Sequence, residues 1–183
     1  MRNFFVKVSK FLSYILRHNP EKFGIILDSE GFADLYSILG VLNERYKDLE
    51  ITREFIEELI RHSDKRRFEI VKDKIRAYYG HSFDDKIIMN EANSLPSNLY
   101  HGTNLEAYEK IKYVGLKKIG RQYVHLSENI ETAISVGKRR TKNPIILVVD
   151  TNIAQKEGIK FFKSGDMYLA EYIPPKYISK LKY

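Results

Sequence analysis

Residues 67–78 read RFEIVKDKIRAY, and this stretch decides the architecture expected for the first half of the chain. Apolar and charged side chains alternate on either side of Lys72-Asp73, a pattern typical of two strands joined by a tight turn. The alternation predicts a hairpin whose core face carries Phe68 and Ile70. The side chains expected on its opposite face are charged: Arg67, Glu69 and Arg76.

Three helices are predicted ahead of this hairpin, over residues 9–18, 34–42 and 52–62. Apolar residues recur at helical spacing in the first, and Asn19-Pro20 ends it because the residue before proline resists helical angles. Arg17 and His18 therefore lie in its last turn, where a capping charge and a surface imidazole are the simplest interpretations. Three helices followed by a hairpin indicate a winged-helix lobe, a scaffold often used on nucleic acids.

The hairpin and the residues before it are rich in positive charge. From Arg61 to Arg76 the sequence has seven basic residues and three acidic ones, and two tyrosines, Tyr78 and Tyr79, follow. Such a stretch suits a ridge that contacts phosphates and stacks on bases. A hairpin edge that is protected by charge explains the same residues equally well.

The second half of the chain predicts a mostly β lobe, so the chain as a whole is expected to be α+β. Residues 1–90 form the first expected lobe, the polar, proline-containing residues 91–98 a linker, and residues 99–183 the second lobe. Strands are expected over 99–100, 123–126, 144–149, 160–163 and 167–173. Helices are expected over 105–114 and 128–136, each ended by a glycine.

Composition limits the possible classes of protein and of partner. The 183 residues contain no cysteine, which excludes disulfides and thiolate metal sites and fits a cytoplasmic protein. No signal peptide or membrane span is predicted at the start of the chain. The net charge of +7 lies entirely in residues 101–183, with 15 basic against 8 acidic side chains. A basic half favours a polyanionic partner or a phosphate-rich ligand, although general solubility is an alternative explanation.

Several common kinds of catalytic site are absent from the sequence. It has no glycine-rich phosphate loop, no dinucleotide-binding fingerprint and no histidine spacing that indicates a metal site. What remains is a set of arginines and histidines, which favours a substrate that brings its own nucleophile and its own negative charge. A phosphate on RNA meets both conditions.

Two short motifs in the second half form a candidate pocket. His101-Gly102-Thr103 and His125-Leu126-Ser127 each combine a ring that can donate or accept a hydrogen bond with a hydroxyl group, and Arg121 precedes the second. Each motif alone is better explained by an ordinary histidine at the edge of a core. Their occurrence together makes a shared ligand site a reasonable hypothesis.

The chain resembles the RNA 2'-phosphotransferase family over nearly its whole length. The resemblance is carried, in order, by S9-KFLSYILRHN-P20, D64-KRR-F68, I75-RAYYGH-S82, Y100-HG-T103, G115-L116, R121-QYVHL-S127 and V136-GK-R139. Position 79 departs from the family pattern, because a glutamine is common where this chain has Tyr79. The resemblance implies a winged-helix lobe and an ADP-ribosyltransferase-like lobe that holds NAD+.

The family's reaction removes an internal 2'-phosphate from RNA, with NAD+ consumed as co-substrate, through a 2'-phospho-ADP-ribosyl RNA. The products are 2'-hydroxyl RNA, nicotinamide and ADP-ribose 1'',2''-cyclic phosphate. The RNA is a tRNA in organisms where the family serves tRNA splicing. The resemblance implies no metal, and it identifies no protein partner.

The family's Arg-His-Arg-Arg catalytic set falls on Arg17, His18, Arg67 and Arg121 of this chain. The residues that match the family's NAD+ site are those of the two short motifs: His101, Gly102, Thr103, His125, Leu126 and Ser127. Further phosphate contacts are expected from Arg66, Arg76 and Arg139, whereas Arg140 is expected to face solvent. The resemblance assigns no role to Gly80, His81 or Ser82.

Two other functions remain open from the sequence. An ADP-ribosyltransferase that modifies terminal phosphates of RNA or DNA would share the NAD+ site and the first step. A non-catalytic RNA-binding or nucleotide-sensing protein could use the same scaffold, although retention of all four Arg/His positions argues against it.

Overall fold

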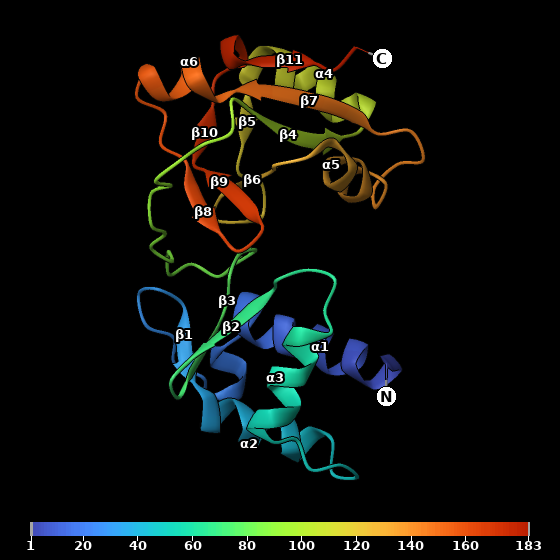
Figure 1. Ribbon diagram of the computed structural model, residues 1–183, viewed down its shortest axis with the longest axis vertical. Coiled ribbons are helices and arrows are strands. Elements are labelled where there is room, and N and C mark those ends of the chain that lie inside the picture. Colours follow the sequence, from blue (N-terminus) through green and yellow to red (C-terminus); the bar gives the residue numbers. More distant parts are fainter. Residues whose placement is uncertain (1, 183) are drawn as a thin grey trace. The chain divides into compact units, whose positions relative to one another are not determined.

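The structure is a computed structural model that describes residues 2–182, and it divides into two compact units between Ile88 and Met89. Both units combine helices with antiparallel sheet, which confirms the α+β class (Figure 1). Each unit has its own hydrophobic core.

The first unit consists of three helices and a small sheet. Its elements are α1 (Arg2–His18), a 3-10 helix (Glu21–Phe23), β1 (Phe32–Asp34), α2 (Leu35–Arg45), α3 (Arg53–Arg61), β2 (Phe68–Val71) and β3 (Lys74–Ala77). The predicted helices and hairpin are all present. Side chains cap α2 and α3 at their N-termini, where Asp34 and Thr52 accept hydrogen bonds from Ser37 and Phe55 amides.

The hairpin closes the core of the first unit as its alternation predicts. Phe68 is 3% exposed, and Ile70 pairs in register with the fully buried Ile75. On the other face Glu69 lies opposite Arg76 and forms an ion pair with it. β1 adds a third strand on the far side of β3, so the strand order is β1-β3-β2.

The second unit is built on a six-stranded antiparallel sheet with the order β11-β7-β4-β6-β9-β8. Its elements are β4 (Asn98–Thr103), α4 (Leu105–Val114), β5 (Leu116–Lys117), β6 (Val124–Ser127), α5 (Ile130–Gly137), β7 (Ile145–Asp150), α6 (Thr151–Lys156), β8 (Phe162–Ser164), β9 (Met167–Ala170), β10 (Tyr172–Ile173), a 3-10 helix (Pro175–Tyr177) and β11 (Ile178–Lys180). Helix α5 packs on β4 and β7 (Figure 1).

Residues 91–98, expected as a linker, pack against the second unit. The Ala92 amide donates to the Phe161 carbonyl over 2.8 Å, and the Thr151 hydroxyl donates to the Pro96 carbonyl. Ala92 is 8% exposed and belongs to the core of this unit. Although its composition is polar, this segment is therefore held against the second unit by hydrogen bonds to its backbone.

The sequence-based elements differ from the observed ones in several places. Helix α1 begins at Arg2, because Phe4 and Phe5 extend its apolar stripe across Lys7. Helix α6 was not predicted, although the Asp150 carboxylate caps it by accepting from the Ile153 amide. The strand expected over 167–173 is broken at position 171, and its two parts, β9 and β10, belong to different sheets.

Candidate functional site

Arg17 and His18 are the last two residues of α1, and contacts from two other segments hold them there. Arg17 Nη2 donates to the Arg67 carbonyl over 3.4 Å, and the guanidinium carbon lies 5.1 Å from the centre of the Tyr79 ring. His18 Nδ1 lies 2.7 Å from Ser82 Oγ. The end of α1 therefore presents a cation and an imidazole whose orientations are both set by neighbours.

Arg67 immediately precedes β2 and is joined to the end of α1 through its own backbone. Its carbonyl accepts from the Tyr78 amide over 2.9 Å as well as from Arg17. Its Nη1 donates to Ser63 Oγ over 2.7 Å, which fixes the direction of the guanidinium. The structure thus brings Arg67 close to Arg17 and His18, although Arg67 follows Arg17 by 50 positions in the sequence.

A groove of about 890 Å³ opens between α1 and α3 and includes two of these three residues. Its walls combine rings, hydroxyls, two carboxylates and basic groups. The lining residues are Phe5, Val6, Ser9, Lys10, Ser13, Tyr14, His18, Glu58, Leu59, His62, Ser63, Asp64 and Arg67. A phosphate held at His18 and Arg67 would have room beside it for the sugar and base that carry it.

The other two basic residues predicted on this unit differ in their surroundings. Arg66 is exposed, and its guanidinium carbon lies 5.9 Å from the Tyr78 ring. Arg76 is ion-paired to Glu69 and lies 3.6 Å from a Glu30 carboxylate oxygen, over the ring of Phe32. Arg76 is thus paired with carboxylates of its own unit, whereas the Arg66 side chain is exposed.

In the second unit, the two short motifs lie on β4 and β6, which are neighbours in the sheet. These two strands share a single pair of facing residues, Tyr100 and Ser127, whereas each is paired along its length with its outer neighbour. His101 on β4 bridges to β6, because its Nδ1 lies 2.9 Å from the His125 carbonyl. His125 makes a local contact instead, because its Nδ1 lies 3.0 Å from the carbonyl of Tyr123, two residues before it.

These two contacts assign the protonation of both rings when they are neutral. A carbonyl oxygen only accepts, so Nδ1 must carry the proton in each ring, and Nε2 is then the acceptor. Burial of the ring lowers the pKa of His101, although the hydrogen bond to the His125 carbonyl opposes this, and Arg140 and Arg121 lower it further. His101 Nε2 can therefore accept a hydrogen bond from a ligand hydroxyl near neutral pH.

The other four residues of the two motifs have different surroundings. Leu126 is fully buried in the core of the second unit, so its side chain supplies packing. Thr103 and Ser127 are 6% and 3% exposed, at the ends of β4 and β6. Gly102 lies directly against α5, and a Cβ built on it would be 2.0 Å from the Ala133 carbonyl oxygen.

Arg121, the fourth predicted catalytic residue, lies on the second unit in the segment before β6 and is exposed. It acts electrostatically on His101, and so does Arg140. Arg139 and Arg140 follow α5, and both are exposed. Arg140 is thus exposed as expected, and its charge acts on His101 from solvent.

No role follows from the sequence for Gly80, His81 and Ser82, although Ser82 contacts two of the predicted catalytic residues. The Ser82 amide donates to the Arg17 carbonyl over 2.9 Å, in addition to the contact between Ser82 Oγ and His18. The sequence signal for this role is the Ser82 hydroxyl in the segment after β3, because serine side chains readily form hydrogen bonds to nearby groups.

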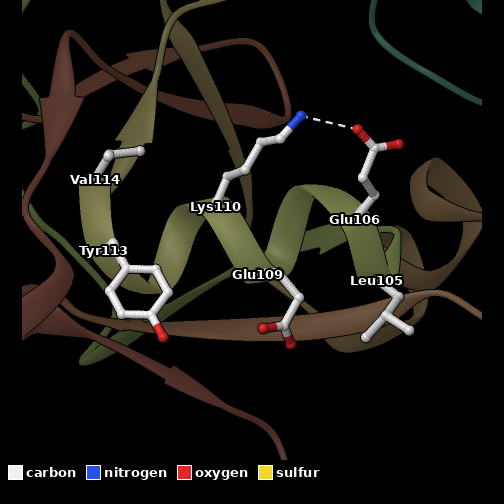
Figure 2. A pocket seen from close by; sticks show the side chains of 6 residues that line it. All are labelled: Leu105, Glu106, Glu109, Lys110, Tyr113 and Val114. Carbon is white, nitrogen blue, oxygen red and sulfur yellow. Dashed lines mark hydrogen bonds and ion pairs between the residues drawn. The ribbon is translucent and has the colours of Figure 1, made fainter.

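A different hollow lies along the outer face of α4 and has other chemistry. Figure 2 shows Lys110 and Glu106 joined across one side of this helix, at 2.8 Å, with Tyr113 and Leu105 apart from them. The hollow is lined by Leu105, Glu106, Glu109, Lys110, Tyr113 and Val114. None of the predicted site residues lines this hollow.

Within residues 2–182, no cluster of three or more His, Asp or Glu side chains is arranged to bind a metal ion. Nor does any helix in this range combine the length and apolar character needed to cross a membrane.

Comparison with known proteins gives one consistent result. Residues 4–171 match the model of the family described as RNA 2'-phosphotransferase, Tpt1 / KptA family. The chain is 46% identical over 173 residues to a probable RNA 2'-phosphotransferase of Acetivibrio thermocellus, with 94% of each chain covered. It is 40% identical over 179 residues to one of Bacillus thuringiensis, covering 97% of this chain and 96% of the relative. A relative from Archaeoglobus fulgidus is 38% identical over 177 residues, and the match covers 97% of this chain and 81% of the relative.

Proposed function

Because the chain belongs to the RNA 2'-phosphotransferase family and is therefore a transferase, we propose that it removes an internal 2'-phosphate from RNA and consumes NAD+. The observation that carries this proposal is the convergence of Arg17, His18 and Arg67 at the end of α1. Guanidinium forks suit a phosphate because they bind two of its oxygens at once.

In the first step, an oxygen of the RNA 2'-phosphate attacks the ribose carbon of NAD+ that bears nicotinamide. The carbon–nitrogen bond breaks and nicotinamide leaves with the bonding electron pair, which neutralises its ring nitrogen. The substrate phosphate is the nucleophile, so the protein needs no serine or cysteine of its own. Its work is to hold the phosphate in line and to stabilise charge.

In the second step, the ribose 2''-hydroxyl of the 2'-phospho-ADP-ribosyl RNA attacks phosphorus. The bond from phosphorus to the RNA 2'-oxygen breaks, and the proton lost by the 2''-hydroxyl is matched by the one gained by the RNA 2'-oxygen. RNA with a free 2'-hydroxyl leaves together with ADP-ribose 1'',2''-cyclic phosphate. Arg17, Arg67 and Arg121 would stabilise the crowded phosphorus centre, and His18 would contact the phosphate or nearby RNA.

The NAD+ site is proposed at β4 and β6, with His101, Gly102, Thr103, His125, Leu126 and Ser127 around it. Support comes from the two rings, whose Nδ1 protons are both used by backbone carbonyls, so that Nε2 can accept from ribose hydroxyls. Leu126 would contribute through its backbone, since its side chain lies in the core.

The two units are proposed to be a winged-helix lobe and an ADP-ribosyltransferase-like lobe. The order of elements in the first unit, α1-β1-α2-α3-β2-β3 with a three-stranded sheet, supports the winged helix. Within it Arg66 is the better candidate for contact with RNA phosphates, because Arg76 is ion-paired to Glu69. Arg139, exposed after α5, is the corresponding candidate on the second unit.

The test is a product analysis on a short RNA that carries one internal 2'-phosphate, with and without NAD+. We expect 2'-hydroxyl RNA and ADP-ribose 1'',2''-cyclic phosphate only when NAD+ is present. Arg67→Ala and Arg121→Ala should abolish phosphate removal, and Arg67→Lys should lose most of it because the planar fork is lost. Arg45→Ala, an exposed arginine at the end of α2, is the matched control.

Other outcomes would replace this function. ADP-ribose that stays on a terminal phosphate of RNA or DNA, with the internal 2'-phosphate untouched, would identify an ADP-ribosyltransferase. Retention of RNA with no consumption of NAD+ on either substrate would identify a binding protein. Normal turnover by Arg67→Ala or Arg121→Ala would refute the residue assignment.

A further inference from the structure

The segment Tyr79–Ser82, which follows β3, contacts the end of α1 through both backbone and side chains. The Ser82 amide donates to the Arg17 carbonyl over 2.9 Å. The last carbonyls of a helix have no partner within the helix, so this bond fixes the final turn of α1 from outside. The two residues in that turn are Arg17 and His18, which the proposed function places on the phosphate.

The Ser82 side chain holds the imidazole of His18. Its Oγ lies 2.7 Å from Nδ1, on the opposite side of the ring from Nε2. A hydroxyl can donate to a bare nitrogen or accept from an N–H, so the contact survives whether the ring is neutral or protonated. His18 Nε2 is thereby aimed in one direction in both charge states.

Arg17 is held by Tyr79 and Gly80. Its guanidinium carbon lies 5.1 Å from the centre of the Tyr79 ring and 5.6 Å from that of Phe68. A Cβ built on Gly80 would lie 3.4 Å from Arg17 Cδ and 3.6 Å from Nη1, and Gly80 has φ +95°. Only glycine adopts this angle without strain, so the chain can turn while still touching Arg17.

His81 anchors the segment on its other side. It is 2% exposed, and its ring packs edge-on against Phe83 at 5.7 Å between ring centres. A Cβ built on Gly31 would lie 3.5 Å from His81 Nε2, so the backbone of the turn before β1 closes over the ring. The segment is thus fastened to the core at His81 and to the end of α1 at Ser82.

We propose that Tyr79–Ser82 is a positioning segment for the phosphate-binding end of α1, and that Ser82 is the residue that fixes the His18 ring. The catalytic part of this proposal rests on the proposed function, since it takes Arg17 and His18 to hold the 2'-phosphate. The structural part does not, because the contacts to Arg17 and His18 exist without substrate. Ser82 acts through His18 and touches no reacting atom.

The central experiment removes one oxygen atom. Ser82→Ala deletes the contact to His18 but keeps the amide bond to Arg17, whereas Ser82→Thr restores the hydroxyl. We expect Ser82→Ala to lower kcat about tenfold, the effect of one lost hydrogen bond on alignment. KM for NAD+ should stay unchanged, and Ser82→Thr should recover most of kcat. Ser29→Ala, an exposed serine of the same unit, should have no effect.

A double substitution separates positioning from general structural damage. If Ser82 works through the His18 ring, Ser82→Ala should have no further effect on a His18→Ala background. An equal loss on both backgrounds, or full kcat in Ser82→Ala, would overturn the proposal. For Arg17, Tyr79→Phe should retain KM for RNA and Tyr79→Ala should raise it, because the ring face makes the contact.

A second readout does not depend on activity. Ring nitrogen resonances of His18, assigned by comparison with His18→Ala, should shift in Ser82→Ala while those of His62, His101 and His125 stay in place. Unchanged His18 resonances would refute the role of Ser82 even if the enzyme is active. Shifted resonances with no turnover by the unmodified enzyme would support the positioning contact and refute the proposed function instead.

Discussion

Replacing Gly102 by alanine tests how β4 and α5 are packed. The added Cβ would lie 2.0 Å from the Ala133 carbonyl oxygen, 2.9 Å from its carbonyl carbon and 3.0 Å from the Gly137 amide nitrogen. Real Cβ atoms essentially never lie closer than 3.0 Å to such atoms. The atoms in the way belong to the backbone, so helix α5 would have to move by roughly 1 Å, and no side-chain rotation can relieve the contact.

Two effects of opposite sign decide the size of the change. Alanine restricts the unfolded chain more than glycine does, which stabilises by about 0.4–1 kcal/mol where the methyl fits. Overpacking a well-packed interface costs about 1–3 kcal/mol, and a backbone obstacle belongs at the upper end. We therefore expect a net loss of about 2 kcal/mol for the second unit, and a fall in Tm of about 8–16 °C for a domain of this size.

Calorimetry and hydrogen exchange would measure this loss and place it in the molecule. In Gly102→Ala, the amides of α5 and β4 should lose protection while those of α1 and α3 keep it. Gly40→Ala is the matched control, because a Cβ at this position in α2 meets nothing within 4 Å. It should stabilise the first unit by about 0.5–1 kcal/mol. A Gly102→Ala protein with unchanged Tm and protection would refute the packing argument.

Three further predictions concern the first unit. Burial chiefly lowers the pKa of His81 from 6.5 to about 4, and the charges of Arg17, His18 and Arg76 add to the shift. Between these pH values, His81 is therefore protonated in the unfolded chain but neutral in the folded chain. Its stability should therefore fall with decreasing pH between 6.5 and about 4, by up to about 3 kcal/mol, and denaturation of His81→Phe should lack this slope. Lys72 has φ 54° in the hairpin turn, a left-handed angle that asparagine adopts more readily than lysine. Lys72→Asn should therefore raise the free energy of unfolding by about 0.5 kcal/mol in the same assay, and a decrease would show that Lys72 is not strained. Arg17→Ala should slow the second step more than the first, so that single-turnover reactions accumulate ADP-ribosylated RNA; its absence would count against that role.

Much of the fold follows from local patterns. The alternation over 67–78 predicts the hairpin and places Glu69 with Arg76 on one face, and the structure pairs them. Helices were predicted where a cap, an apolar stripe and a stop signal agree, as at Thr52 for α3. Elements without such agreement were missed, including β1, whose three residues become a strand only by pairing with β3.

The candidate site divides in the same way. The identities of Arg17, His18 and Arg67, and their resemblance to a family, are properties of the sequence. Their proximity is not, because it depends on the Arg67 carbonyl reaching the end of α1. The tautomer of His101 likewise follows from the His125 carbonyl, which lies 24 positions away in the sequence.

The sequence by itself determined the class of protein, the chemistry available to it and the elements that local signals define. Charge, motif order and periodicity are readable along the chain, because they depend on neighbours a few residues apart. Only the tertiary structure decided that Ser82 holds His18, that Gly102 makes room for α5 and that Arg76 is bound within the sheet. Each of these depends on the approach of atoms that are distant in sequence, and such distances are set by packing of the whole unit.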